Sequence, residues 1–174
     1  MRAVVLQCHP LRSSYNEAML ERTCRGLEAG GATPEVHRLA EGDDPDGDEI
    51  VGAELLVLVH PTWWGGLPAP LLGWVQRHVG PWIDAGAPSH TSPVRTVRGL
   101  VSVTSHGSSH LINRVQGEGG RQLLRRSVLP LCASGARHHW IALYKLDRLE
   151  PSDLEAFLDR VERETRLTTS RSAA

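Results

Sequence analysis

Short apolar runs alternate with helical patterns along the whole chain. Between the runs, apolar residues recur at helical spacing, and Gly30-Gly31 ends the first of these helices. Two central runs are apolar at successive positions, as strands buried on both faces require. Five runs have the length and residue types of β-strands: Ala3–Leu6, Pro34–Leu39, Leu55–Val59, Leu100–Thr104 and Trp140–Tyr144.

This alternation predicts a single α/β domain. Strands separated by helices form a parallel sheet with helices on both faces, and right-handed crossovers bring the loops after the strands to one edge. For five strands we expect the doubly wound order 2-1-3-4-5, with a ligand outside the carboxyl ends of the strands. We assign residues 1–167 to this domain and expect residues 168–174, which offer little to bury, to form a frayed tail.

Composition and charge limit the classes of partner and the cellular compartment that we expect for this protein. The 174 residues carry 19 basic and 20 acidic side chains, so we expect no nucleic-acid partner. The longest apolar stretch is far shorter than the roughly 20 residues that span a bilayer, and the chain opens directly into a strand. Cys8, Cys24 and Cys132 lack disulfide or zinc spacing, and no histidine pair has a metal-binding spacing on a helix. We therefore expect a cytoplasmic protein with no integral membrane segment and no bound metal.

The loop after the first strand places hydrogen-bond donors at the start of a helix. It has neither a dinucleotide-type glycine turn nor a P-loop, but it contains His9, Ser13, Ser14 and Asn16. Backbone N–H groups and the helix dipole favour an anion at such a position. The same serines and asparagine also suit a plain N-cap, and the sequence leaves both interpretations open.

Two further loops are expected at the same edge. The loop after the third strand contains Trp63 and Trp64 followed by two glycines, which let backbone approach a flat ligand closely. This pattern favours a planar heteroaromatic ligand, although either indole would also serve as a cap on the core. The loop after the fourth strand, Thr104–His110, is small and polar, and by itself it is typical of an ordinary turn.

These loops resemble the NAD(P)H:quinone oxidoreductase (diaphorase-like) family of the flavodoxin-like superfamily, in its short bacterial form. The shared motifs are H-P-x-x-x-S-x-N from His9 to Asn16, H-P-x-W-W-G-x-x-P-A from His60 to Ala69, and T-x-x-G from Thr104 to Gly107. The first two are fairly specific in combination and the third is weak. The resemblance extends over most of the chain.

The resemblance implies a flavin site and a redox reaction. It implies FMN or FAD as cofactor, NAD(P)H as hydride donor to flavin N5, a quinone or similar aromatic acceptor, and a homodimer with its active site at the subunit interface. The implied contacts to the flavin phosphate are His9, Ser13, Ser14, Tyr15 and Asn16. The implied contacts to the flavin ring are Pro61, Thr62, Trp63, Trp64, Gly65, Thr104, Ser105 and Gly107.

One departure from the family concerns the groups that stabilise reduced flavin. The mammalian enzymes place a Tyr and a His after the third loop, whereas the equivalent positions here hold Asn113 and Gly119. His106 and His110 are the candidates to replace them as catalytic residues. Two other functions stay open: a flavin-binding regulatory subunit that accompanies a membrane transporter, and a domain that binds a partner without flavin.

Overall fold

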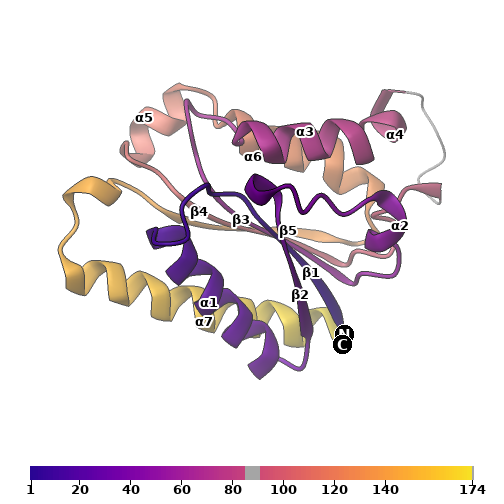
Figure 1. Cartoon of the computed structure of the whole chain (residues 1–174), viewed down its shortest axis with the longest axis horizontal. Coiled ribbons are helices and arrows are strands. Elements are labelled where there is room, and N and C mark those ends of the chain that lie inside the picture. Colours follow the sequence, from indigo (N-terminus) through magenta and orange to yellow (C-terminus); the bar gives the residue numbers. More distant parts are fainter. Residues whose placement is uncertain (85–90, 174) are drawn as a thin grey trace.

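A parallel five-stranded sheet forms the centre of the molecule (Figure 1). The computed structural model describes residues 1–84 and 91–173. The strand order is β2-β1-β3-β4-β5, and every neighbouring pair is parallel, so the predicted topology is confirmed. The strands are β1 (Arg2–Gln7), β2 (Thr33–Arg38), β3 (Leu55–Pro61), β4 (Gly99–Ser105) and β5 (Arg137–Leu143).

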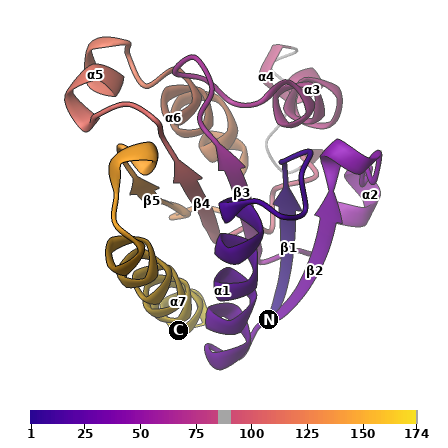
Figure 2. The same cartoon turned by 60° about the vertical axis from the view of Figure 1, so that its left-hand side comes forward.

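Helices cover both faces of the sheet, as Figures 1 and 2 show. One face is covered by α1 (Tyr15–Ala29) and α7 (Pro151–Ala173). The other face is covered chiefly by α3 (Ala69–His78) and by a segment that runs from α6 (Gly119–Leu123) through a π-helical turn (Leu124–Val128) into a 3-10 turn (Leu129–Leu131). The shorter helices are α2 (Gly47–Ile50), α4 (Gly80–Asp84) and α5 (His110–Val115), with further 3-10 turns at Leu39–Glu41 and Leu146–Arg148.

The central strands are buried along their whole length. Every residue of β3 and of β4 is buried, which explains why their sequences are apolar at successive positions. Alternate side chains then enter two separate cores, because successive residues of a strand point to opposite faces. Leu56 and Leu58 pack under α3, while Val57 and Val59 pack under α1 and α7.

The last helix is longer than the sequence pattern indicates. The tail expected to fray from residue 168 is helical to Ala173, and Thr168 and Thr169 are buried; residue 174 lies outside the described part. The threonine hydroxyls donate to carbonyls one turn earlier, Thr169 to Thr165 at 2.9 Å, so their burial leaves no unpaired group. The apolar periodicity missed this turn because its buried side chains are threonines.

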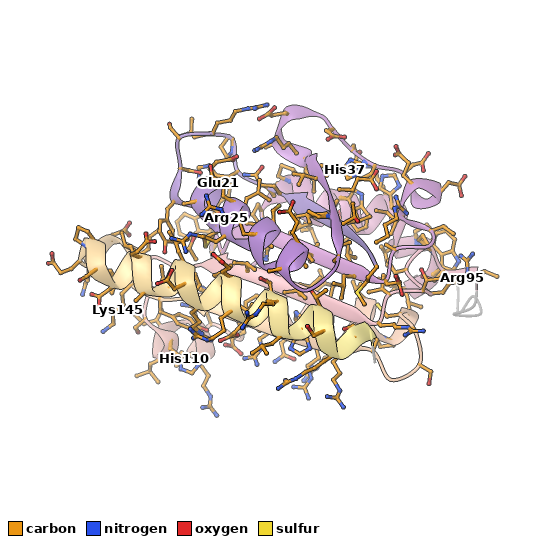
Figure 3. The ribbon with its side chains drawn as sticks, turned by 90° about the horizontal axis from the view of Figure 1, so that it is seen from below. Glu21, Arg25, His37, Arg95, His110 and Lys145 are labelled. Carbon is orange, nitrogen blue, oxygen red and sulfur yellow. The ribbon has the colours of Figure 1, made fainter. Side chains whose placement is uncertain are left out.

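Gly26, which has no side chain, allows α1 and α7 to approach each other closely. A Cβ at Gly26 would overlap the Thr165 hydroxyl and the Glu162 carbonyl of α7. A hydrogen bond also joins the two helices at the start of α1, where the Tyr15 hydroxyl donates to the Leu154 carbonyl at 2.7 Å. The first and last helices are therefore packed with their backbones in close contact, and Figure 3 shows α7 lying beside α1.

The sheet register aligns the carboxyl ends of the strands at one edge. Gln7 is paired with Val59, Pro61 with Ser105, and Ser105 with Leu143. The loops after β1, β3 and β4 all begin there (Figure 2). Within the described ranges, no helix has the length and apolar character needed to cross a membrane, and no cluster of three or more metal-ligating side chains occurs.

Candidate functional site

Three loops at the carboxyl edge of the sheet contact one another. The His9 ring lies 6.2 Å from that of Trp63, which joins the loops after β1 and β3. The Thr62 hydroxyl is 2.9 Å from the Thr104 hydroxyl, and the Thr62 N–H donates to the Ser105 carbonyl at 2.8 Å. The topology therefore brings the three sequence motifs together, as the order of elements predicts.

The loop after β1 presents donors that have no acceptor. Within the described ranges, none of the backbone N–H groups of residues 12 to 16 makes a hydrogen bond, whereas the Leu11 N–H donates to Nδ1 of His9 at 3.1 Å. Ser14 occupies the N-cap position of α1, yet its side chain makes no capping bond. The Ser14 hydroxyl, which can donate, is buried without a partner among the described residues, and so is Asn16 Oδ1, which is an acceptor. The plain N-cap interpretation therefore fails for Ser14, and the helix terminus is left open to an anion.

Charges around this helix terminus are paired among themselves. Arg12 donates to Glu41 at 2.8 Å, and Arg38 donates to Glu17 in the first turn of α1 at 2.7 Å. The Arg38 guanidinium holds the pKa of the Glu17 carboxyl below its ordinary value. The negative charge of Glu17 is thereby offset, so the free N–H groups keep their attraction for an anion.

The side chain of Tyr15 does not join these donors. Its hydroxyl is bonded to the Leu154 carbonyl of α7, and burial raises the pKa of that hydroxyl to about 12. Tyr15 therefore supplies only its backbone N–H to the loop. Ser13 is exposed, and no side-chain hydrogen bond occupies it in the described structure.

The loop after β3 forms a tight turn with a tryptophan at its tip. The Gly66 N–H donates to the Trp63 carbonyl at 2.9 Å, and the two central residues, Trp64 and Gly65, have φ of 54° and 74°. This is the pattern of a type I′ turn, which suits Gly65 but is unusual for a tryptophan. The Trp64 side chain is fully exposed and that of Trp63 is 44% exposed. Neither indole caps the core, so the core interpretation of the pair is wrong.

The loop after β4 is held from both sides. Thr104 and Ser105 are buried at the end of β4, and the next N–H, that of His106, donates to the Leu143 carbonyl at 2.8 Å. A Cβ at Gly107 would lie 3.1 Å from the Asp147 carboxylate. The exposed His110 begins α5, where the Ser109 hydroxyl accepts from the Ile112 N–H at 3.3 Å. The loop is thus an ordered platform.

The two candidate histidines have different environments. His106 is buried, and its ring stacks on that of Tyr144 with centroids 4.5 Å apart. His110 is exposed, and its ring contacts the Tyr144 ring edge-on, with the two centroids 5.0 Å apart. Burial lowers the pKa of His106, against the opposite effect of the hydrogen bond that His106 donates to Asn113. His106 is therefore neutral at physiological pH.

A cavity of about 10 Å³, the size of one water molecule, lies behind the Trp turn. Its lining includes Thr62, His106 and Trp140. His106 Nε2, His60 Nε2 and the Trp140 indole nitrogen are buried without hydrogen-bond partners among the described residues. The Trp140 ring lies 6.2 Å from that of His60 and 6.3 Å from that of His106. Three buried ring nitrogen atoms without hydrogen-bond partners therefore lie close together beneath the loops after β3 and β4.

Several of the residues beneath these loops escaped the sequence analysis. His60 belongs to a strand that otherwise reads as apolar, and burial lowers its pKa to about 4. Trp140 and Tyr144 lie in and just after β5, where the sequence suggests only a strand. Asn113 stood out only as a departure from the family. The structure pairs Thr104 with His60 on one side and with Ala142 on the other. Knowledge of this register would have placed His60, Trp140 and Tyr144 beside the loops.

Comparisons with known proteins agree with this architecture. The profile of the flavodoxin-like fold family matches residues 1–162. No curated protein sequence matches the chain. Among solved structures, Smu.1420 from Streptococcus mutans UA159 has a TM-score of 0.77 at 18% identity, covering 96% of this chain and 100% of its own.

Two further structures carry functional names. The NAD(P)H:quinone oxidoreductase from Methanothermobacter marburgensis has a TM-score of 0.74 at 22% identity, covering 95% of this chain and 94% of its own. The FMN-dependent NADH-azoreductase from Bacillus anthracis str. Ames Ancestor, in complex with FMN, has a TM-score of 0.73 at 13% identity, covering 99% of each chain. At these identities the likeness establishes the fold. With the profile match over residues 1–162, it follows that the chain belongs to the flavodoxin-like fold family.

Proposed function

We propose that this chain is a flavin-dependent NAD(P)H oxidoreductase that passes a hydride, through flavin N5, to a quinone or a similar aromatic acceptor. The observation that carries the proposal is the donor-rich N-terminus of α1, with the buried and unpaired Ser14 hydroxyl, beside the exposed Trp63–Trp64 turn. Likeness to structures named as a quinone oxidoreductase and an FMN-dependent azoreductase supports the same assignment.

The phosphate end of the cofactor fits the loop after β1. The free N–H groups of residues 12 to 16 point to one terminus of a 15-residue helix, where a phosphate gains both hydrogen bonds and the helix dipole. The Ser14 hydroxyl supplies a further donor. We assign His9, Ser13 and Asn16 to the same cradle and Tyr15 to it through its backbone alone. The similar structure that contains FMN makes FMN the first cofactor to test, with FAD as the alternative.

The ring end fits the loops after β3 and β4. The N–H groups of Trp64 and Gly65 make no hydrogen bond within the described ranges, and the Thr62–Thr104 hydroxyl pair lies in the same loop region. When bound, flavin supplies the hydride acceptor and donor, N5. The backbone donors of these loops would then stabilise the charge that builds at the ring edge on reduction. His106, held neutral by burial, would accept a hydrogen bond at Nε2 beneath this edge.

A second copy of the chain completes the proposed site. Apolar side chains on α5 are unusually exposed: Leu111 at 70% and Val115 at 81%. Figures 1 and 2 show α5 beside the loop that follows β3. The same loop is contacted by the start of α6, where the Gly120 N–H donates to the Gly65 carbonyl at 3.3 Å. Exposed apolar groups gathered in this way indicate a protein–protein contact. We propose a homodimer in which this surface and Trp64 cover the active site.

A visible absorption spectrum tests the function most directly. The purified protein, incubated with FMN or FAD and then desalted, is expected to retain flavin bands that bleach when NADH or NADPH is added without oxygen. Reoxidation by a soluble quinone completes the cycle. Bands that neither nucleotide bleaches would contradict the oxidoreductase and favour a regulatory flavoprotein. A protein that retains neither flavin would exclude the flavin site and leave the fold alone.

A further inference from the structure

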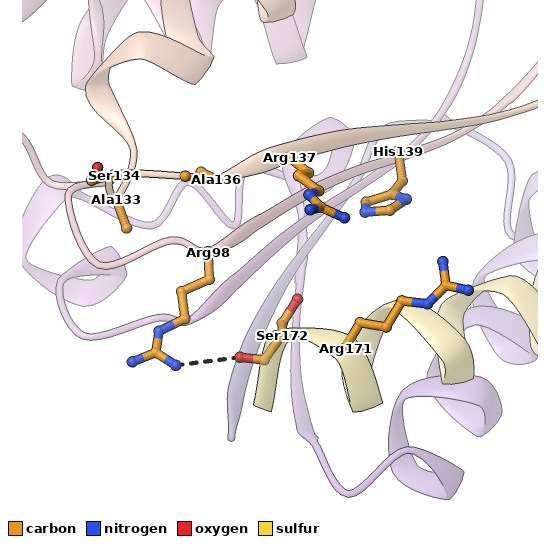
Figure 4. A pocket seen from close by; sticks show the side chains of 9 residues that line it. Arg98, Ala133, Ser134, Ala136, Arg137, His139, Arg171 and Ser172 are labelled. Carbon is orange, nitrogen blue, oxygen red and sulfur yellow. Dashed lines mark hydrogen bonds between the residues drawn. The ribbon is translucent and has the colours of Figure 1, made fainter. Parts of the chain in front are cut away.

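A hollow of about 650 Å³ lies at the opposite edge of the sheet from the three loops. It is bounded by the amino-terminal ends of β4 and β5, by residues 133–136 before β5, and by the last turn of α7 (Figure 4). The strands β4 and β5 have seven residues each, so this hollow lies about 20 Å along the sheet from the proposed flavin loops.

The charges that line this hollow are all positive. Arg98, Arg137 and Arg171 line it together with His139, and no carboxylate is among the lining residues. In the described part of the chain, none of these three arginines has an acidic partner. Some other arginines do have an acidic partner, such as Arg2 with Glu35 at 2.7 Å and Arg77 with Asp44 at 2.6 Å. The molecule as a whole carries a charge of −1, so this local excess of cations is not a general property of its surface.

The side chains approach the hollow from two elements. Figure 4 shows Arg137 and His139 extending from β5 toward Arg171 and the Ser172 hydroxyl on α7. Arg98 has a different role, because it donates to the Ser172 carbonyl at 3.4 Å and so caps the end of α7. Arg137 and Arg171 thus remain as two free guanidinium groups that face each other across the opening.

The positive charges of Arg137 and Arg171 act on His139, which lies between them. Burial lowers the pKa of His139, and Arg171 and Arg137 lower it further. His139 is therefore neutral and acts as a hydrogen-bonding group, while the two arginines supply the charge. No carboxylate lines the hollow, although Glu164 lies close enough to His139 to oppose the effect of the arginines on its pKa. Two guanidinium groups match the geometry of phosphate oxygens, which they bind through paired N–H groups.

We propose that this hollow binds a small ligand with two linked phosphate groups. A single exposed ion pair contributes little to affinity, so one phosphate is insufficient. Two phosphates allow Arg137 and Arg171 to bind one each, with the Ser134 and Ser172 hydroxyls and His139 around them. The site stands apart from the proposed flavin loops, so its occupant does not compete with flavin and the proposal stands independently of the redox function.

Calorimetric titration with inorganic pyrophosphate at about 0.1 M salt, where screening acts over about 10 Å, tests the proposal. We expect binding by the wild type and a loss of about tenfold or more in affinity for Arg137→Gln with Arg171→Gln. The matched control is Arg163→Gln with Arg166→Gln, which removes two exposed charges from α7 outside the hollow and is expected to leave affinity unchanged. Inorganic phosphate is expected to bind about tenfold more weakly than pyrophosphate.

The outcomes separate this site from the α1 terminus, the other anion site. Wild type that does not bind pyrophosphate overturns the proposal. So does a double variant at Arg137 and Arg171 that binds like wild type, since pyrophosphate would then occupy another place. An equal loss in both double variants would show attraction by net charge alone and would also overturn it. Thermal unfolding of each variant checks that these exposed substitutions leave the fold intact.

Discussion

The side-chain oxygen of Asn113 accepts a hydrogen bond from Nδ1 of His106 at 2.8 Å, and this bond fixes the tautomer of the histidine. The Asn113 amide nitrogen donates to the Ser109 carbonyl at 2.9 Å, so the oxygen must face the imidazole. Nδ1 therefore carries the proton, and the buried Nε2 presents a lone pair. Asn113 thus orients His106 to accept a hydrogen bond at the cavity rather than to donate one.

Asn113→Ala is expected to lower the free energy of unfolding by about 1–3 kcal/mol, since it leaves the Nδ1–H of His106 buried without an acceptor. Urea unfolding measures the change. Arg114→Ala, at an exposed neighbouring position of α5, serves as the control and should change the stability by less than about 0.5 kcal/mol. Equal stabilities of the Asn113 variant and wild type would show that the bond does not hold His106 in place.

Ser14→Ala combined with Asn16→Ala is expected to weaken flavin retention while the stability of the apoprotein changes little. Ser14 makes no capping bond, so its removal costs the helix nothing, whereas a bound phosphate loses donors. Asp46→Ala is the contrasting variant, because the Asp46 side chain accepts from the Asp48 and Glu49 N–H groups. That change should cost about 0.5–2 kcal/mol of stability and leave flavin binding intact. Flavin titration and thermal unfolding measure both quantities, and a loss of stability without a loss of flavin in the double variant would restore the N-cap interpretation.

Trp64→Ala is expected to reduce flavin affinity by about 0.5–1.5 kcal/mol, the contribution of an aromatic contact beyond its buried area. The free energy of unfolding of the monomer should stay unchanged, because the side chain buries nothing within the chain. Leu167→Ala, which removes a partly exposed apolar side chain from α7, is the control for flavin binding. Equilibrium titration with FMN detects the difference, and equal affinities in all three proteins would remove Trp64 from the site.

Gly26→Ala is expected to destabilise the protein by about 1–3 kcal/mol through overpacking, since the added methyl group meets the α7 backbone. The same substitution at Gly73 in α3 should have the opposite sign, because its Cβ meets only the flexible end of Arg77. There alanine should raise the stability by about 0.5–1 kcal/mol through helix propensity. Thermal unfolding of the two variants compares them directly, and destabilisation of similar size at both positions would contradict the close packing of α1 and α7.

Stability is expected to fall as the pH drops from about 6.5 to about 4. Burial lowers the pKa of both His60 and His138 to about 4, while an unfolded histidine takes up its proton near pH 6.5. Between these values the unfolded state binds more protons, so each histidine costs about 1.4 kcal/mol per pH unit, with no effect above this window. His138→Gln should reduce the slope of stability against pH, and His110→Gln, at an exposed position, should not. Denaturant unfolding across this pH range provides the measurement.

Periodicity was sufficient for the sheet but not for the site. Continuous apolar runs located the central strands, because a strand covered on both faces has to be apolar throughout, whereas β2 is indicated by alternation. The apolar run ends at Val59 and so predicts His60 in the loop, whereas it is a buried residue of β3 whose surroundings depend on its neighbours across the sheet. Motifs brought Ser14 and Trp64 to attention. Their informative properties, an unpaired hydroxyl and a left-handed backbone, are set by tertiary structure and leave no trace in the residue pattern.

The close packing of α1 against α7 has a consequence for folding during synthesis, because the two helices lie at opposite ends of the chain. During synthesis, the β1–α1 unit emerges first, yet the partner that covers Gly26 and the adjacent Leu27 is made more than a hundred residues later. Until α7 has been made, this face of α1 stays uncovered and available to chaperones or to other nascent chains. Fragments that end before residue 151 should therefore aggregate rather than fold.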